Sequence, residues 1–458
     1  MLVLQVRLSS WDEELYAEYD GRLFLSGLGA ARWLVDNISY SDNCTLEVVV
    51  VEARDRIGGR IYSYCPEDST VKGLYDLGAS WIHDPSINPL TVMAKSLQLK
   101  TLDSDYGDEV VTTLDGQRYA DNKFQQDFSQ YELALFSSVA EARANGMNDA
   151  SIETLLADKL DKSNPLFSLF MSGLEFELGA PLRHCSGTEC IDEDWLKAIN
   201  GVGDSNSTHL ESYNQPDDFL LPECGFSAVI DGLRSGAAVK KTNMEPKKQK
   251  NKSKDTTGSL PARSADFEVL LCHEVTHIIQ RETSTGDTAQ RKISITVRKH
   301  KQQTHNYVFD SATAATSEPD PQSQTADSID PEALQIDADA VIVTVPLGVL
   351  KHGDITFTPP LSPAKQHAID TVGFGNVVKV IIEFSSVFWP THTLFLALAD
   401  EKLANPQDRG LLTYFLNGHK MAKKKVLVGY GLGNGADRLD AVRNLHCILL
   451  FLLSEILL

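Results

Sequence analysis

The segment from Thr45 to Arg60 carries the residue types that bind a nucleotide diphosphate. A β-branched run, TLEVVVVEA (45–53), ends in the acidic Glu52 and leads directly into EARDRIGGR (52–60). A carboxylate at the end of such a strand accepts hydrogen bonds from the hydroxyls of an adenosine ribose. A diphosphate needs a cation and small residues that let the backbone approach, and this segment has both. The competing interpretation is a tight hairpin with a solvated arginine.

Two further side chains could take part in chemistry. Lys379 lies in the strand-like VVKVIIEF, where a lysine either points outward or is buried with a partner and a lowered pKa. The pattern alone leaves both options open. His83, in SWIHDP, sits in a predicted turn, where a histidine is as readily structural as chemical. We find no convincing Cys-His or Ser-His-Asp arrangement and expect no metal site.

The helix that should position Glu52 lies about 25 residues upstream, in SGLGAARWLVDN (26–37). Its apolar side chains fall on one face, namely Leu28, Ala31, Leu34 and Val35. A helix followed by a strand that ends in an acid forms the second half of a dinucleotide-binding βαβ unit. If Gly27 is the third glycine of G-x-G-x-x-G, the first two positions hold Arg22 and Phe24, whose side chains would obstruct the diphosphate. RLFLS (22–26) allows a short strand, and residues 1–21 show no match to such a unit.

Later segments alternate between strand-like and helical patterns. FEVLLCHEVTHIIQ (267–280) and KISITV (292–297) read as strands, and ADAVIVTVP (338–346) reads as a buried strand. The region from about 120 to 235 reads as mostly helical. Two polar stretches, 240–264 and 301–331, read as disordered insertions. We favour a solvated loop over a nucleic-acid patch for the lysine-rich first insertion.

Composition sets broader limits. The 458 residues include 63 Asp+Glu and 42 Lys+Arg, giving a formal net charge of -21, which disfavours nucleic acid and agrees weakly with cationic ligands. Seven scattered cysteines without a CxxC pair predict reduced thiols in an intracellular protein. No secretory signal is predicted, and the apolar end, Leu445–Leu458, is short for a membrane span. We expect a cytoplasmic protein, with peroxisomal and nuclear locations left open.

The sequence resembles the flavin-containing amine oxidases, a family that includes monoamine oxidases, polyamine oxidases and histone lysine demethylases. The resemblance rests on five blocks in order: 26–81, LPECGFSAVIDGL (221–233), HEVTHI (273–278), 339–384 and 415–440. It favours the polyamine-oxidase type. It implies an α/β fold in which a discontinuous Rossmann-like FAD domain carries an inserted substrate domain of mixed sheet and helices.

The resemblance also implies the site residues. It assigns the ribose to Glu52, the pyrophosphate to Arg60, the adenine contact to the Val275 backbone, and the substrate-facing position to His83. Lys379 aligns with the lysine that bonds a water at flavin N5. The other implied FAD-binding residues are Gly27, Ala53, Arg54, Gly58, Gly59, Gly78, Ala79, Ser80 and Trp81. The family's usual motif at this point is W-I-H-G, and in this sequence Asp84 stands in place of its glycine.

The reaction implied is hydride transfer from an amine to FAD, which yields an imine, then an aldehyde, and hydrogen peroxide after reoxidation by oxygen. The expected division of the chain is FAD domain at 22–101, helical substrate domain at 102–220, FAD domain again at 221–365, substrate domain again at 366–444, and an apolar tail at 445–458.

Departures from the family make activity a separate question. Besides Arg22 and Phe24, nothing after Asp440 matches the late G-E-containing loop and helix that close the family's FAD site. We therefore expect a chain truncated at both ends. A catalytically inactive fragment with at most a binding role is the alternative, and a histone demethylase ranks lower. The substrate amine and the oligomeric state stay open.

Overall fold

The chain divides into two compact units, each built from separate stretches of sequence. Unit 1 comprises residues 1–63, 86–99 and 226–372, and unit 2 comprises 64–85, 100–225 and 373–458. The computed structural model describes residues 2–8, 26–37, 46–64, 75–104, 109–113, 116–119, 121–147, 149–191, 218–222, 225–236, 267–283, 290–300, 333–399, 405 and 409–441. Arg22, Phe24, both predicted insertions and the apolar tail lie outside these residues. The predicted domain division stays a prediction; in the two units described here, segment 64–85 belongs to the unit that holds Lys379.

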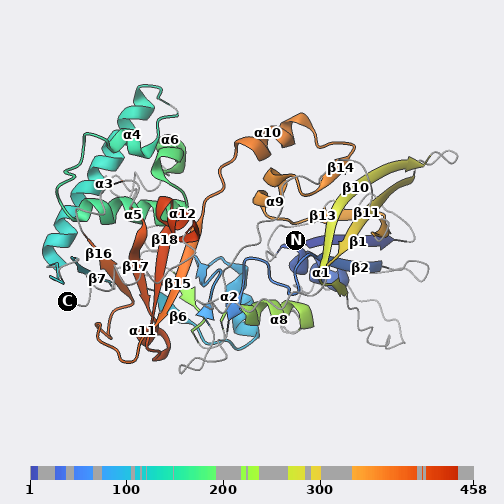
Figure 1. The fold of residues 1–458 in the computed structure, drawn as a ribbon, viewed down its shortest axis with the longest axis horizontal. Helices are drawn as coiled ribbons and strands as arrows, with labels where there is room; N and C mark the ends of the chain where they lie inside the picture. The colour runs from blue at the N-terminus through green and yellow to red at the C-terminus, as the bar shows by residue number, and fades with distance from the viewer. Residues whose placement is uncertain are drawn as a thin grey trace, which may run out of the picture. The chain divides into compact units, whose positions relative to one another are not determined.

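Unit 1 contains two sheets with helices beside them (Figure 1). One sheet has the order β13-β1-β2-β9 and the other the order β12-β11-β10-β14. Their strands are β1 (Leu2–Leu8), β2 (Leu46–Glu52), β9 (Glu268–Leu270), β10 (His273–Thr283), β11 (Gln290–Lys299), β12 (Leu334–Ala338), β13 (Ala340–Val343) and β14 (Thr356–Thr358). The helices are α1 (Ser26–Asn37), α2 (Pro89–Ser96), α8 (Ser227–Ser235), α9 (Leu347–His352) and α10 (Pro363–Thr371).

Apolar patterning explains the core of unit 1. Val49 and Val51 of β2 pack with Val275, Ile295 and other buried side chains of the second sheet. The predicted helix at 26–37 is α1, and its apolar face is buried, with Leu28 and Ala31 at 3% and 0% exposed. Ser26, which belongs both to the predicted helix and to the possible short strand 22–26, begins the helix.

One strand of unit 1 was missed, and one expectation about this unit was wrong. Residues 2–8 form a strand, β1, that we did not predict. The missed signal is LVLQVRL, in which every second residue from Leu2 is apolar. Residues 340–343 form the expected strand β13, but it is not buried: it ends the sheet order, and Ile342 and Val343 are each 36% exposed. An apolar run indicates burial only when other layers cover both faces.

Unit 2 combines a five-stranded sheet, in the order β15-β18-β17-β16-β7, with a helical layer (Figure 1). A three-stranded sheet has the order β5-β8-β6, and β3 pairs with β4. The strands are β4 (Tyr75–Asp76), β5 (Trp81–His83), β6 (Leu102–Ser104), β7 (Glu109–Thr112), β8 (Asp218–Leu220), β15 (Val377–Glu383), β16 (Phe395–Leu398), β17 (Leu411–Asn417) and β18 (Val426–Leu432), and β3 (Ser63–Tyr64) lies at the boundary between the units.

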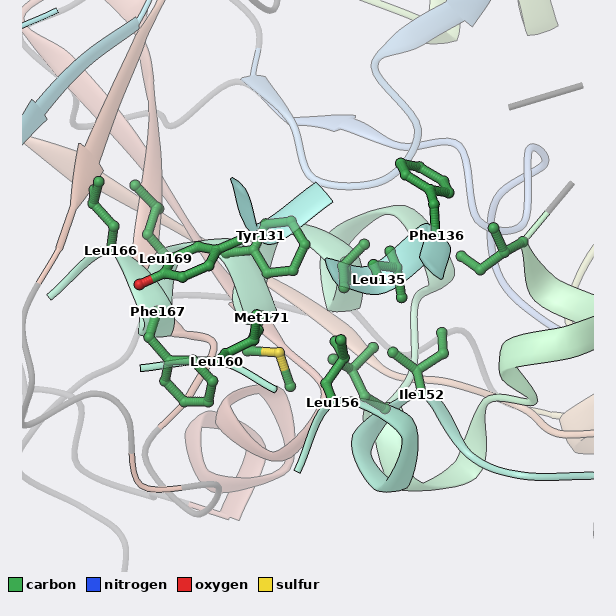
Figure 2. Close-up of a cluster of buried hydrophobic side chains, with 14 of the residues drawn as sticks. Tyr131, Leu135, Phe136, Ile152, Leu156, Leu160, Leu166, Phe167, Leu169 and Met171 are labelled. Atoms are coloured by element: carbon green, nitrogen blue, oxygen red, sulfur yellow. The ribbon is translucent and has the colours of Figure 1, made fainter. Parts of the chain in front are cut away.

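The predicted helical region is confirmed within the described residues. The helices of unit 2 are α3 (Asp121–Ala144), α4 (Ile152–Leu156), α5 (Leu166–Leu178), η2 (Leu182–His184), α6 (Gly187–Cys190), α11 (Gly418–Ala422) and α12 (Asn434–Ala441). Figure 2 shows how Tyr131 and Leu135 of α3 gather with Ile152 and Leu156 of α4 and Leu169 of α5 in one core cluster. The C-cap Gly179 ends α5 at φ 64, a left-handed conformation that favours glycine.

Candidate functional site

The end of β2 in unit 1 places Glu52 where a nucleotide-binding acid is expected. Its side chain is buried, at 2% exposed, and its Oε1 accepts a hydrogen bond from the Arg54 backbone N–H at 2.9 Å. Ala53 beside it is half-buried. Burial of a carboxylate costs free energy unless hydrogen-bond donors satisfy it, so this position suits an acceptor for ribose hydroxyls.

The turn after Glu52 requires its glycines. Gly58 has φ +102, and a Cβ there would lie 2.7 Å from the Ile61 backbone oxygen, so a side chain would clash. Gly59 has φ +56, a conformation that glycine adopts without strain. Arg56 closes the turn by donating from Nη1 to the Ile61 backbone oxygen at 3.2 Å and from Nη2 to that of Gly59 at 3.0 Å. We did not predict this role for Arg56, because a side chain that folds back onto its own turn leaves no sequence pattern.

Cations and a helix start supply the partners that a diphosphate needs. Arg54 and Arg60 are both exposed, and among the described residues neither guanidinium has a partner. Gly27 is buried in the first turn of α1, a helix of 12 residues. The N-terminus of such a helix carries free N–H groups and a partial positive charge. Together with the buried carboxylate of Glu52, these residues fit the adenosine and diphosphate parts of FAD.

The direction of β1 departs from a dinucleotide-binding unit. β1 runs antiparallel to β2, with Leu2 beside Glu52 and Leu8 beside Leu46. A strand that feeds a phosphate-binding turn must end at the edge where β2 ends, but β1 begins there. The direction of β1 is therefore opposite to that of the first strand in a dinucleotide-binding unit.

Val275 lies on β10 of unit 1, completely buried and paired with Val297 of β11. The β10–β11 register shifts between Val275 and His277. The turn before β10 is tied to the Glu52 loop, because the Cys272 N–H donates to the Arg54 backbone oxygen at 2.8 Å. Val275 and Glu52 therefore belong to one connected part of unit 1.

Lys379 of unit 2 is half-buried on β15 and bonded to a distant segment of the chain. Its Nζ lies 3.2 Å from the Asp76 backbone oxygen and 2.5 Å from both the Gly78 backbone oxygen and Ser80 Oγ. Burial lowers the pKa of Lys379 to about 8. The negative charge of the Asp76 carboxylate acts in the opposite direction and raises this pKa. A lysine in this setting exchanges protons closer to neutral pH than an exposed one does.

The segment that Lys379 contacts is the predicted flavin-facing one. Ser80 is buried at 5% exposed, Gly78 is half-buried, and Ala79 is exposed. The Trp81 indole N–H donates to Ser104 Oγ at 3.3 Å, and its ring stacks at 6.5 Å between centroids on Phe395. Lys379 and the segment from Gly78 to Trp81, singled out separately in the sequence, thus come together in unit 2.

His83 differs from Lys379 and Ser80 because its side chain is exposed to solvent. It ends β5 and pairs in register with Asp218 of β8. Asp84, which follows it, has φ 45, so an aspartate holds the left-handed conformation that a glycine would adopt freely. The change from W-I-H-G therefore keeps a glycine-like backbone at this turn.

The described residues contain no group of three or more His, Cys, Asp or Glu side chains that could hold a metal ion. No helix in those parts of the chain is long and apolar enough to cross a membrane.

Comparison with known proteins gives an extended match. The model of the family described as flavin containing amine oxidoreductase matches residues 25–310 and 314–444. Among curated proteins, the chain is 27% identical over 432 residues to probable polyamine oxidase 4 of Arabidopsis thaliana, covering 91% of this chain and 66% of the relative. It is 26% identical over 420 residues to polyamine oxidase 5 of Oryza sativa subsp. japonica, covering 88% and 64%. The chain thus spans just under two thirds of the length of these relatives.

A histone demethylase and a solved structure also match. Lysine-specific histone demethylase 1B of Mus musculus is 24% identical over 398 residues, covering 85% of this chain and 37% of the relative. A triple mutant of putrescine oxidase aligns with a TM-score of 0.55 at 14% identity, covering 94% of this chain and 78% of that one. At this identity the structural match concerns the fold, and it confirms the predicted α/β class.

Proposed function

The chain belongs to the family of flavin-containing amine oxidoreductases, and on that basis we propose that it is an FAD-dependent oxidase of polyamine-type amines. Support for the polyamine class comes from its relatives, which are named as polyamine oxidases. The net charge of -21 agrees in sign with a cationic substrate.

We assign the FAD contacts of unit 1 by chemistry. The Glu52 carboxylate accepts from the ribose hydroxyls, Arg54 and Arg60 pair with the diphosphate, and Gly27 lets the α1 N-terminus approach it. The Val275 backbone contacts the adenine. In unit 2, Gly78, Ala79, Ser80 and Trp81 border the flavin ring, and His83 faces the substrate.

When bound, FAD supplies the redox chemistry by accepting a hydride from the carbon next to the amine nitrogen and passing the electrons to oxygen. The protein positions the amine, which gives up the hydride in its neutral form. We assign to Lys379 the bonding of a water needed for this chemistry. An ammonium has three N–H donors, and Lys379 has three oxygen acceptors. Release of one acceptor frees a donor for that water.

The observation that carries the proposal is the joining of Lys379 to Gly78 and Ser80, about 300 residues earlier in the chain. Burial lowers the pKa of Lys379 to about 8, and strongly shifted pKa values cluster at functional sites. Here it contacts the segment that the family resemblance assigns to the flavin.

A peroxide assay with stopped-flow flavin spectra tests this function. The FAD-loaded chain should release hydrogen peroxide with spermine or acetylated polyamines faster than with simple monoamines or a methyl-lysine peptide. Lys379→Met should slow flavin reduction or reoxidation by about 10- to 100-fold, because the positioned donor is lost. Lys420→Met is the matched control: that half-buried lysine donates to the His392 backbone oxygen at 2.7 Å, and its loss should leave both rates unchanged.

Two outcomes would contradict the proposal. Equal rates for Lys379→Met and the parent chain would remove the assigned role of Lys379. A chain that binds FAD and releases no peroxide with any of these amines would instead be a non-catalytic member of the family.

A further inference from the structure

Tyr430 faces Lys379 from the neighbouring strand of the unit 2 sheet. The two residues are directly paired between β15 and β18, so their side chains leave the same face of the sheet. The Lys379 Nζ lies 5.7 Å from the centroid of the Tyr430 ring and 5.6 Å from that of Trp81. Both distances are within the range at which an aromatic face attracts a cation, about 6 Å.

The ring of Tyr430 is fixed by its surroundings. Tyr430 is 1% exposed, packs edge-on against Phe176 at 5.3 Å between centroids, and lies 6.1 Å from the Trp81 ring. Its hydroxyl is buried and has no hydrogen-bond partner among the described residues. Burial also raises the pKa of the Tyr430 hydroxyl, so the ring stays neutral. No hydrogen bond of the hydroxyl to a described residue therefore explains the position of this side chain. Tyr430 contacts Lys379 through the face of its ring.

We propose that Tyr430 is a positioning residue for Lys379. The ring faces of Tyr430 and Trp81 hold the Lys379 ammonium against the backbone oxygens of Asp76 and Gly78 and against Ser80 Oγ. Two opposing effects then set the charge of the lysine. Desolvation favours the neutral amine, whereas the aromatic faces, the three oxygens and the Asp76 carboxylate favour the cation. The consequence for amine oxidation rests on the proposed function, but the arrangement itself does not.

The test follows the titration of Lys379 by NMR in the full chain labelled with ¹³C at lysine Cε, with the resonance assigned through Lys379→Arg. Tyr430→Phe keeps the ring and should leave the titration midpoint within about 0.2 pH units. Tyr430→Leu keeps an apolar side chain but removes the ring face, and should lower the midpoint by about 0.5–1 pH unit, a three- to tenfold change in the ionisation constant. Tyr414→Leu is the matched control, because Tyr414 also packs on Phe176, at 6.0 Å, and should give no shift.

An unchanged midpoint in Tyr430→Leu, or an equal shift in Tyr430→Phe, would overturn the proposal. If Tyr430→Leu does not fold, pentafluorophenylalanine at position 430 decides the matter, since it keeps the shape of the ring and reverses its quadrupole. That chain should show the lowered midpoint, and the parent midpoint would overturn the proposal. In an active chain the pH dependence of flavin reduction should shift by the same amount. A shifted midpoint without oxidase activity would contradict the proposed function and leave the role of Tyr430 intact.

Discussion

Glu109 is a second side chain whose charge is set by burial. It begins β7 in unit 2, and burial raises the pKa of its carboxyl from 4.5 to about 7. Burial raises the pKa of the Tyr414 hydroxyl, and the negative charge of Glu109 adds to that rise. Neither residue carries a motif, because the burial of an isolated glutamate depends on the helices and strands that surround it. Sequence reasoning therefore missed Glu109.

The stability of unit 2 should depend on pH through Glu109. The folded pKa is above the unfolded one, so the contribution of this group is fully present below pH 4.5 and is lost as the pH rises through about 7. Glu109→Gln removes the titration, and should raise the free energy of unfolding at pH 8 by about 1–3 kcal/mol while changing it little at pH 4.5. Urea denaturation at both pH values measures this. A gap between variant and parent that is the same at both pH values would contradict the assignment.

The turn at Asp84 gives a backbone test at the same scale. Asp84 has φ 45, where a β-branched residue is strained and glycine is not. Asp84→Val should lower the free energy of unfolding by about 1–2 kcal/mol relative to Asp84→Gly. Both variants lose the carboxylate and its interactions, so their difference isolates the backbone. Equal urea midpoints for the two variants would show that this residue is not held in the left-handed conformation.

Elements were predictable where one segment carried its own pattern. The helix at 26–37 and the strands at 273–283 and 290–299 follow from periodicity and β-branched composition. Partners and directions were not predictable from the same signals. The pairing of Lys379 with Tyr430 depends on the register between β15 and β18, and the antiparallel course of β1 depends on which strands accept it. Such information resides in tertiary contacts, not in a single segment.

The open strand β13 makes a prediction at the element scale. Its exposed Ile342 leaves an apolar edge, which is a site for association between chains. Ile342→Lys should reduce self-association in light scattering and change the free energy of unfolding by less than about 0.5 kcal/mol. Val341, the neighbour on the opposite face, packs against the core of unit 1, so Val341→Lys should cost about 2 kcal/mol or more. Identical stability of the two variants would show that β13 does not present these faces as described.

At the scale of the whole molecule, the family and the fold class follow from ordered motifs, and the FAD-binding residues of unit 1 stay a prediction. The buried Glu52 and the glycine turn agree with that prediction, whereas β1 runs opposite to the strand that should lead into α1. The curated relatives are longer, since the chain spans 66% and 64% of the two plant polyamine oxidases. Flavin binding is thus the property on which the proposed activity depends.

The visible absorption spectrum of the purified chain after incubation with FAD and gel filtration tests that property directly. The account predicts that flavin absorbance stays with the protein near one flavin per chain, and that Glu52→Leu lowers this ratio at least tenfold because the ribose loses its buried acceptor. A parent chain that elutes colourless, with all flavin in the small-molecule fraction, would contradict it.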